Sequence, residues 1–177
     1  LMNSSIIINE NAGVELFLYS EDIADWASLD TAGFDFDPIY NSEETWAYGA
    51  FSNQGTIHPD YGWGIYNQNT HDIVGDRLFI IKTQGGDYLK IIIDKLDRSG
   101  VWFFRTAKLD GSNENSYEYA KSNEASVDKN FALFDLTKGE FDYSNADSKA
   151  WDILFTKYIT TVMQGPVTQD MAVSGVK

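Results

Sequence analysis

Short apolar runs separated by turn residues are the feature that most constrains the fold of this chain. The clearest example lies between residues 75 and 96, where GDRLFIIKT and DYLKIIIDKL flank a glycine pair. β-Branched and aromatic residues favour strands, and a glycine pair between two such runs favours an antiparallel turn. The run VWFFRTAKL follows directly after RSG. The whole stretch therefore predicts a three-stranded antiparallel meander.

Similar runs recur along most of the chain, and only one segment, residues 21–28, has helical spacing. Ser20 would cap this short amphipathic helix, with Ile23, Trp26 and Ala27 on one face. We therefore predict an all-β fold, a mostly antiparallel meander or sandwich with one or two short helices. The other expected strands are SSIIIN, GVELFLY, TWAYGAF, GWGIYNQ, SYEYA, NFALFDL, GEFDY and AWDILFTKYIT. The expected core includes Ile91, Ile93, Trp102, Phe104, Ile153 and Phe155.

The strand WDILFTKY, residues 151–158, lies near the end of the chain and needs partners that come from elsewhere. Strict alternation would place Trp151, Ile153 and Phe155 on one face, with Asp152 and Leu154 on the other. Its partners are expected in the first half of the chain or in a segment beyond this sequence. The chain also begins in one expected strand and ends just after another, MAVSGV. We therefore expect residues 1–177 to form a single β domain or a fragment of a larger protein.

Composition excludes several classes of function. The chain has 177 residues, a formal charge of −14 and no cysteine. The negative charge repels a phosphate backbone, so nucleic acid is not expected as a partner. The absence of cysteine removes disulfides, thiolate catalysis and cysteine-bound metals. The motifs GxSxG, HExxH, Walker A and GxGxxG are also absent, and the two histidines of the chain leave few general bases. We predict that the protein is not an enzyme.

Several residues could carry binding chemistry, although each also has a structural interpretation. His58 and His71 flank the strand GWGIYNQ, and Met163 and Met171 flank QGPVTQD. Imidazole and thioether groups can ligate a metal or haem iron, but a turn position or a packed strand explains them equally well. The oxygen-bearing side chains of DGSNEN (Asp110, Asn113, Asn115) and FDFDP (Asp35, Asp37) are most simply loop residues. An aromatic platform could comprise Trp46, Tyr48, Trp63, Tyr66 and Trp102.

The stretch NFALFDLTKGEFDYSNADSKAWDILFTKY resembles the opening of the HmuY family, the haem-binding lipoproteins of Gram-negative bacteria. An earlier stretch, from GWGIYNQ to GVWFFRTAKLDGSNE, resembles the closing meander of that family. The two stretches cover about two-thirds of the chain, and their order is inverted relative to the family. A seam between two HmuY-like half-units is therefore expected near residues 121–129, with circular permutation as the rival explanation. The matched residues are Phe131, Phe134, Leu136, Gly139, Trp151, Asp152, Phe155, Lys157 and Tyr158.

The resemblance implies an all-β haem- or porphyrin-binding protein, anchored to the outer membrane by a lipid or secreted. One family histidine comes five residues after a strand tryptophan, and counting from Trp63 places Gln68 in that slot. An amide is a weak iron ligand, so we rank His71 first and His58 second, with Met163 and Met171 third. Trp63 and Tyr66 would form the walls around the ring. The expected partners are haem or another small ligand, and an outer-membrane protein.

A second class of function stays open beside haem binding. A non-catalytic surface module could bind a glycan or join an outer-membrane assembly without any haem. Exposed aromatic rings serve a sugar as well as a macrocycle, so the residues alone leave both alternatives in place.

Overall fold

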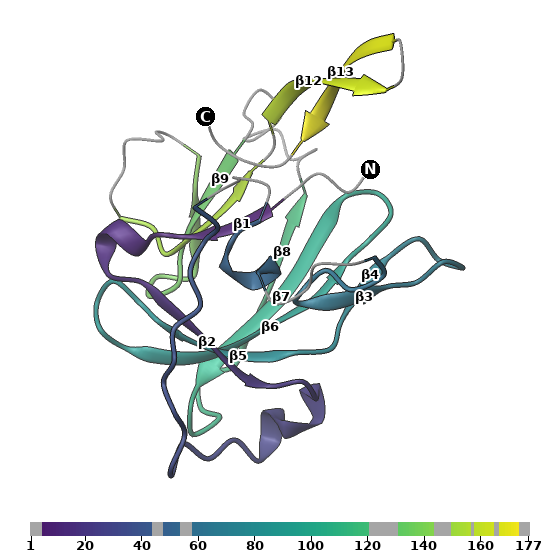
Figure 1. Ribbon diagram of the computed structural model, residues 1–177. Helices are drawn as coiled ribbons and strands as arrows, with labels where there is room; N and C mark the ends of the chain where they lie inside the picture. Colours follow the sequence, from purple (N-terminus) through teal and green to yellow (C-terminus); the bar gives the residue numbers. More distant parts are fainter. Residues whose placement is uncertain are drawn as a thin grey trace.

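The computed structural model describes residues 5–43, 48–53, 58–120, 131–143, 150–156, 158–164 and 167–173. These residues form antiparallel β-sheets connected by turns and short 3₁₀ helices, which confirms the predicted all-β class (Figure 1). The expected seam at residues 121–129 lies outside the described residues. The strands are β1 (Ser5–Ile8), β2 (Glu15–Ser20), β3 (Gly64–Tyr66), β4 (Ile73–Gly75), β5 (Leu78–Lys82), β6 (Tyr88–Leu96), β7 (Val101–Lys108), β8 (Asn115–Ala120), β9 (Phe131–Asp135), β10 (Glu140–Asp142), β11 (Ile153–Thr156), β12 (Tyr158–Gln164) and β13 (Val167–Val173).

The larger sheet has seven strands and is built around the long strand β6. The predicted meander β5–β6–β7 is present and continues into β8. Strand β7 pairs along one edge of β6, while β5 and β4 pair with successive parts of β6 on its other edge. Strands β2 and β3 then complete the sheet next to β5 and β4. The predicted strand at 75–83 corresponds to β5 over residues 78–82, and Gly75 at its start belongs to β4.

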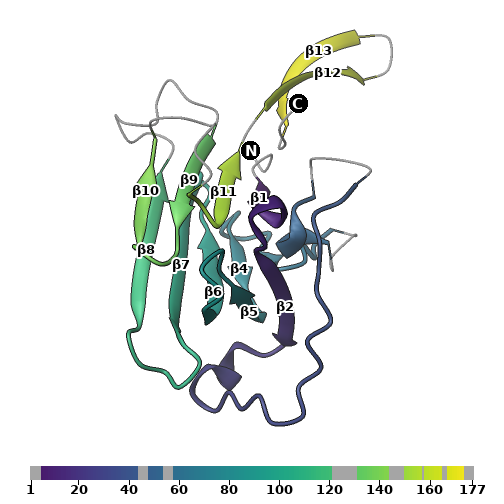
Figure 2. The same ribbon diagram turned by 90° about the vertical axis from the view of Figure 1, so that its left-hand side faces the viewer.

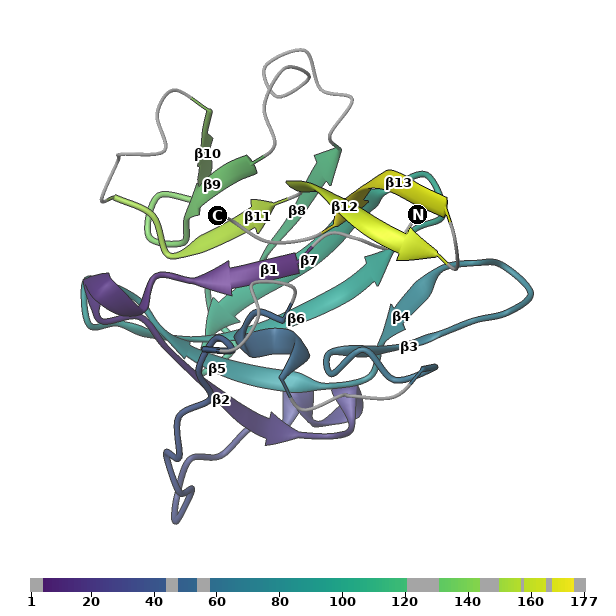
Figure 3. The same cartoon turned by 45° about the horizontal axis from the view of Figure 1, so that its top comes forward.

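The smaller sheet has four strands in the order β1, β11, β9, β10, and it faces the larger sheet (Figure 2). Strand β11 pairs with β9, which precedes it, and with β1 from the start of the chain. The first-half alternative for the partners of this strand is therefore confirmed. The predicted continuous strand 150–160 is divided into β11 and β12, and β12 pairs with β13 in a separate hairpin that projects from the sandwich (Figure 1). In the view of Figure 3 this hairpin lies in front of the sandwich.

The core fills the space between the two sheets, and the six residues predicted to be buried are all at most 2% exposed. Alternating side chains from both sheets meet there, as expected for strands with one face toward a core. Phe104 of the large sheet, for example, packs against Phe134 and Phe155 of the small sheet at ring-centroid distances of 5.1 and 5.5 Å. Other members of this core include Ile6, Ile8, Phe79, Ile81, Ile91, Ile93, Trp102 and Ile153.

Part of the outer face of the large sheet is also buried, because the segment between β2 and the 3₁₀ helix η3 (Ala50–Ser52) covers it. Phe36 of this segment contacts Phe17 and Tyr88 at centroid distances of 5.2 and 5.5 Å. The buried Lys90 donates a hydrogen bond to the Trp26 carbonyl oxygen at 2.6 Å, and its ammonium group lies 4.6 Å from the centroid of the Trp26 ring. Aromatic side chains thus anchor this segment on the large sheet.

The predicted helix at 21–28 is a 3₁₀ helix, η2 (Ile23–Ala27), with no buried residue, so it is not the expected amphipathic helix. Its N-cap is Asp22, whose carboxylate accepts from the Ala24 amide at 2.8 Å. Ser20 was the wrong cap, because its hydroxyl instead accepts from the Asp22 amide and donates to Asp25. Two other 3₁₀ helices are described, η1 (Glu10–Ala12) and η3 (Ala50–Ser52). Helix η3 stands where the sequence predicted the end of a strand at 45–51.

Alternation fails at the start of β11. Ile153 and Phe155 face the main core as predicted, but Trp151 packs with Leu154 against the outer side of the small sheet. The strand begins only at Ile153, and the Asp152 amide and carbonyl bond to Phe134 and Asn9. These contacts fix the chain before the regular strand begins, so the residues on either side of Asp152 do not share a face.

Candidate ligand-binding cleft

Three of the residues named as candidate haem contacts lie together on the surface. The Tyr66 hydroxyl lies 2.6 Å from Nδ1 of His71. His58 lies beside the same tyrosine, with ring centroids 5.2 Å apart. His58 and His71 are both exposed, and His71 has a left-handed backbone with φ of 64°. The structure thus brings two imidazoles to one half-buried tyrosine.

The other two candidate haem contacts differ in exposure. Gln68 is exposed in the same turn as His71, between β3 and β4. Trp63 is only 3% exposed and packs against Trp102 with a centroid distance of 5.1 Å. Trp63 is therefore part of the core and offers no ring face at the surface. Met163 and Met171 lie in β12 and β13, so the expected loop between them is a strand hairpin.

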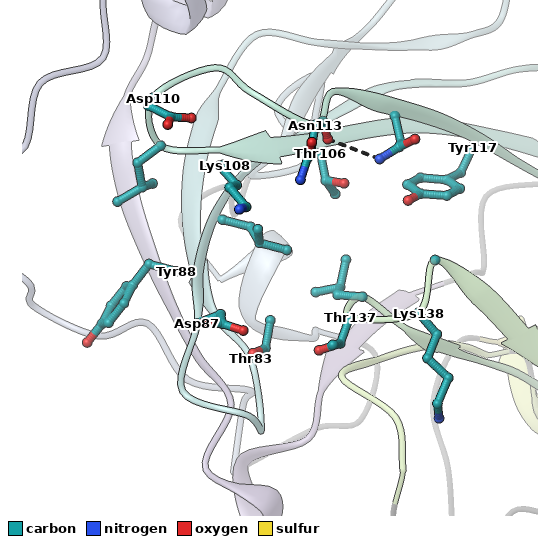
Figure 4. A pocket seen from close by; sticks show the side chains of 15 residues that line it. Thr83, Asp87, Tyr88, Thr106, Lys108, Asp110, Asn113, Tyr117, Thr137 and Lys138 are labelled. Atoms are coloured by element: carbon teal, nitrogen blue, oxygen red, sulfur yellow. Dashed lines mark hydrogen bonds between the residues drawn. The ribbon is translucent and has the colours of Figure 1, made fainter.

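A cavity of about 740 Å³ lies elsewhere, at one end of the sandwich. Its walls come from the β5–β6 turn, the β7–β8 hairpin and the β9–β10 turn, and Figure 4 shows their side chains converging on it. This volume is within the range of small-molecule sites. We call it the cleft, and none of the five candidate haem contacts lines it. Its lining residues are Thr83, Asp87, Tyr88, Leu89, Thr106, Lys108, Leu109, Asp110, Asn113, Asn115, Tyr117, Leu136, Thr137, Lys138 and Gly139.

The charges around the cleft balance, in contrast to the strongly acidic chain. The two lysines of the lining, Lys108 and Lys138, match its two acids, Asp87 and Asp110. Lys138 bonds to Asp135 at 2.7 Å, and its side chain points away from the centre of the cleft (Figure 4). Hydrogen bonds from Ser112 lower the pKa of Asp110, which keeps that carboxylate ionised within its own turn. The balanced charge favours a ligand without a net charge.

Thr83 lines the cleft and has a buried hydroxyl that is unsatisfied among the described residues. The residue is 1% exposed and lines the cavity, and among the described residues its Oγ1 has no hydrogen-bond partner. A buried polar atom without a partner costs about 1–3 kcal/mol relative to a satisfied one. A bound group that hydrogen-bonds to this hydroxyl would recover that energy. Thr106, also buried, adds a second hydroxyl-bearing residue to the lining.

Tyr117 gives the cleft a fixed aromatic wall. Its ring stacks on Phe104 and meets Phe134 edge-on, with centroid distances of 5.1 and 4.8 Å. The chain passes close by at Gly139, where a Cβ atom would lie 2.8 Å from the Tyr117 hydroxyl oxygen. Gly139 also has φ of 69°, a conformation that residues with a side chain rarely adopt. The glycine thus allows the turn and the tyrosine to share this wall.

A second cavity of about 440 Å³ lies on the outer side of the small sheet. Its apolar part is formed by Ile7, Leu133 and Leu154, with Phe131 and Trp151 packed against them. The remaining lining residues are Ile8, Asn9, Glu10, Asn11, Asn41, Ser42, Glu43 and Tyr48.

Asp110, Asn113 and Asn115 of the DGSNEN turn line the cleft, whereas the other candidates from the sequence form no site together. Asp110 and Asn115 make bonds within the β7–β8 hairpin loop, and Asp35 and Asp37 are exposed. The aromatic platform is dispersed, since Tyr48 is 49% exposed while Trp63 and Trp102 are in the core, and Trp46 lies outside the described residues. Within the described part of the chain, no three His, Cys, Asp or Glu side chains are grouped to hold a metal. No helix there is long and apolar enough to cross a membrane.

Comparisons with models of known protein families, with curated proteins and with solved structures found no match. The cleft itself was missed at the sequence level. Its residues come from three turns that lie far apart along the chain, so no local motif records it. Two local signals were present: the DGSNEN turn, whose Asp110, Asn113 and Asn115 line the cleft, and the Gly85–Gly86 turn, which places Thr83 at a strand end, where loops carry binding residues.

Proposed function

We propose that this protein is a non-catalytic binding module whose cleft takes an uncharged, hydroxyl-rich ligand such as a saccharide unit. The observation that carries this proposal is the buried, unpaired hydroxyl of Thr83 in a cavity of about 740 Å³. Hydroxyl groups of a sugar can both donate and accept, which suits a lining of threonine, asparagine and tyrosine side chains.

The aromatic rings of the lining support the same ligand class. Tyr117 is held by its ring contacts, and Tyr88 is 38% exposed at the cleft edge. The apolar face of a sugar ring packs on an aromatic ring, while its hydroxyls bond at the ring edges. The balanced charge of Lys108, Lys138, Asp87 and Asp110 disfavours a strongly anionic or cationic ligand.

A survey of neutral and charged saccharides by NMR tests this proposal. The amide spectrum of the full chain is recorded while each saccharide is added at millimolar concentration. A neutral saccharide should shift the amides of Thr83, Thr106 and Gly139 in a saturable way. Binding of charged saccharides alone, or shifts confined to other parts of the molecule, would contradict the proposal.

Haem binding is a second candidate, favoured by the contact of Tyr66 with both histidines. An imidazole at the surface can ligate iron, and Tyr66 already bonds to one of the two histidines. On the resemblance to the HmuY family alone, this candidate also carries a location at the cell surface or outside the cell, and an outer-membrane partner. A haem titration followed by the Soret band tests it. A sharp, saturable band supports haem binding, and an unchanged spectrum excludes it.

A further inference from the structure

We infer that Asp152 is a positioning residue that holds the two walls of the cleft at a fixed separation. The inference rests on the proposed function for its importance to a ligand, but its geometry does not depend on that function. The carboxylate joins a turn of the large sheet to a turn of the small sheet. Its two oxygens each accept one hydrogen bond, from the Gln84 amide at 2.9 Å and the Leu136 amide at 2.7 Å.

The two amides lie in opposite walls of the cleft. Gln84 follows Thr83 in the β5–β6 turn, and Leu136 begins the β9–β10 turn. Thr83 and Leu136 both line the cavity, as do Asp87 later in the first turn and Thr137, which directly follows Leu136. A single carboxylate thus connects both walls next to the unpaired Thr83 hydroxyl.

The backbone of Asp152 is itself fixed, so its carboxylate is placed by the small sheet. Its amide donates to the Phe134 carbonyl oxygen at 2.9 Å, and its own carbonyl oxygen accepts from the Asn9 amide at 3.0 Å. The side chain is fully buried, with 0% of the residue exposed. A wall movement would therefore break a buried hydrogen bond.

Acidification should loosen this connection. Burial raises the pKa of Asp152, with a smaller contribution in the same direction from Asp135, while Lys138 and the two amides act to lower the pKa. Asp135 and Lys138 are the charged groups that act on it from the adjacent turn. A protonated carboxyl presents one hydroxyl in place of a carboxylate oxygen, so it accepts less well from one of the two amides.

Protonation of Asp152 should loosen the connection between the walls and yet raise the overall stability of the fold. Because the pKa is raised in the folded state, the folded chain binds this proton more readily than the unfolded chain does. Protonation of Asp152 therefore contributes stability as the pH falls through its folded pKa, and this contribution levels off below the ordinary value of about 3.9. A loss of wall contact together with unchanged or increased stability would distinguish positioning from general support of the fold.

The chain has no native cysteine, so two spin labels can report the wall separation directly. The exposed residues Asp87 and Thr137, one in each wall, are replaced by cysteine and labelled, and their distance distribution is measured by pulsed electron resonance. We expect one narrow distribution at neutral pH, which shifts and broadens on acidification with a midpoint above about pH 4.

The distance distribution of the labelled Asp152→Asn variant should be broad at every pH. An amide offers only one acceptor oxygen and turns its NH₂ donor toward the other backbone amide. Asp94→Asn is the matched control. Burial also raises the pKa of Asp94, but this residue pairs with Arg105 at 3.5 Å and does not line the cleft. This control should keep both the narrow distribution and its response to pH.

Hydrogen exchange in the unlabelled wild type keeps the inference testable if Asp152→Asn does not fold. The protection factors of Gln84 and Leu136 should fall on acidification while those of the core strands hold. An unchanged distance distribution in acid, or constant protection of these two amides, would overturn the inference. If the walls respond but no saccharide binds at any pH, the proposed function fails and the role of Asp152 stands.

Discussion

The hydroxyl oxygen of Tyr66 lies 2.6 Å from Nδ1 of His71, so the end of β3 is tied to the turn that leads into β4. If haem is bound at this group, His71 is the first expected ligand and His58 the second. His71→Ala should then lower haem affinity at least tenfold, and His58→Ala should lower it less. Gln68→Ala is the matched control, since this exposed amide lies in the same turn. Equal Soret titrations for all three variants and the wild type would refute this assignment.

The stability of the fold should depend strongly on Phe104. This residue contacts Tyr117, Phe134 and Phe155 in the core between the sheets. Truncation of a buried phenylalanine leaves a cavity, so Phe104→Ala should lower the free energy of unfolding by about 3–5 kcal/mol.

The neighbouring Phe103 is the matched control for this truncation. It is half-buried on the opposite face of β7, where its ring lies 4.7 Å from Lys95 Nζ. Phe103→Ala should cost about 1 kcal/mol or less. Urea unfolding measures both variants, and similar losses for the two would contradict the assigned core.

Gly139→Ala should be more destabilising than the same change at Gly100. Both glycines have positive φ, at 69° and 90°, so each substitution carries a backbone cost of about 1–2 kcal/mol. At Gly139 the added Cβ would also lie 2.8 Å from the Tyr117 hydroxyl oxygen, whereas nothing lies within 4 Å of it at Gly100. Thermal unfolding measures the stability of both variants. An equal loss of stability would show that the Tyr117 side chain moves aside without a cost in free energy.

The Asp60–Arg77 pair should give the protein a stability that is lost in acid. Two bonds of 2.8 Å join the carboxylate to the guanidinium group, and these bonds lower the pKa of Asp60. Because the folded pKa is lowered, the contribution is present above the ordinary value of about 3.9 and disappears as the pH falls through the folded pKa.

Asp60→Asn should therefore lower the free energy of unfolding by about 1–3 kcal/mol at neutral pH, and the difference from the wild type should shrink in acid. Asp37→Asn, at an exposed carboxyl, is the control and should leave the stability unchanged at every pH. Urea unfolding between neutral and strongly acidic pH measures both. A difference that does not vary with pH would show that the ion pair is not its source.

The strands and the core were predictable because their signals are local. The period of two in β6 and β7 places Ile91, Ile93, Trp102 and Phe104 on one face, and all four are buried there. Trp63, which comes just before β3, also belongs to this core, where its ring packs against Trp102. The predicted ring wall at Trp63 is therefore wrong.

The cleft and the start of β11 could not be predicted from local patterns. Asp152 interrupts the alternation because its backbone and carboxylate bond to segments near residues 9, 84 and 136. The Thr83 hydroxyl is unusual only because no described neighbour pairs with it, a fact that depends on the assembled fold. Both features follow from contacts between residues that are distant in sequence.

The saccharide affinity of Thr83→Val tests the central claim most directly. Valine keeps the shape of threonine and removes only the hydroxyl, so the cleft should stay intact. Thr70→Val, in the turn between β3 and β4 away from the cleft lining, is the control. We predict that calorimetric titration of a neutral saccharide selected by NMR gives at least a tenfold weaker affinity for Thr83→Val and an unchanged affinity for Thr70→Val. Equal affinity of Thr83→Val and the wild type would contradict the assignment of this hydroxyl, and with it the cleft, as the binding site.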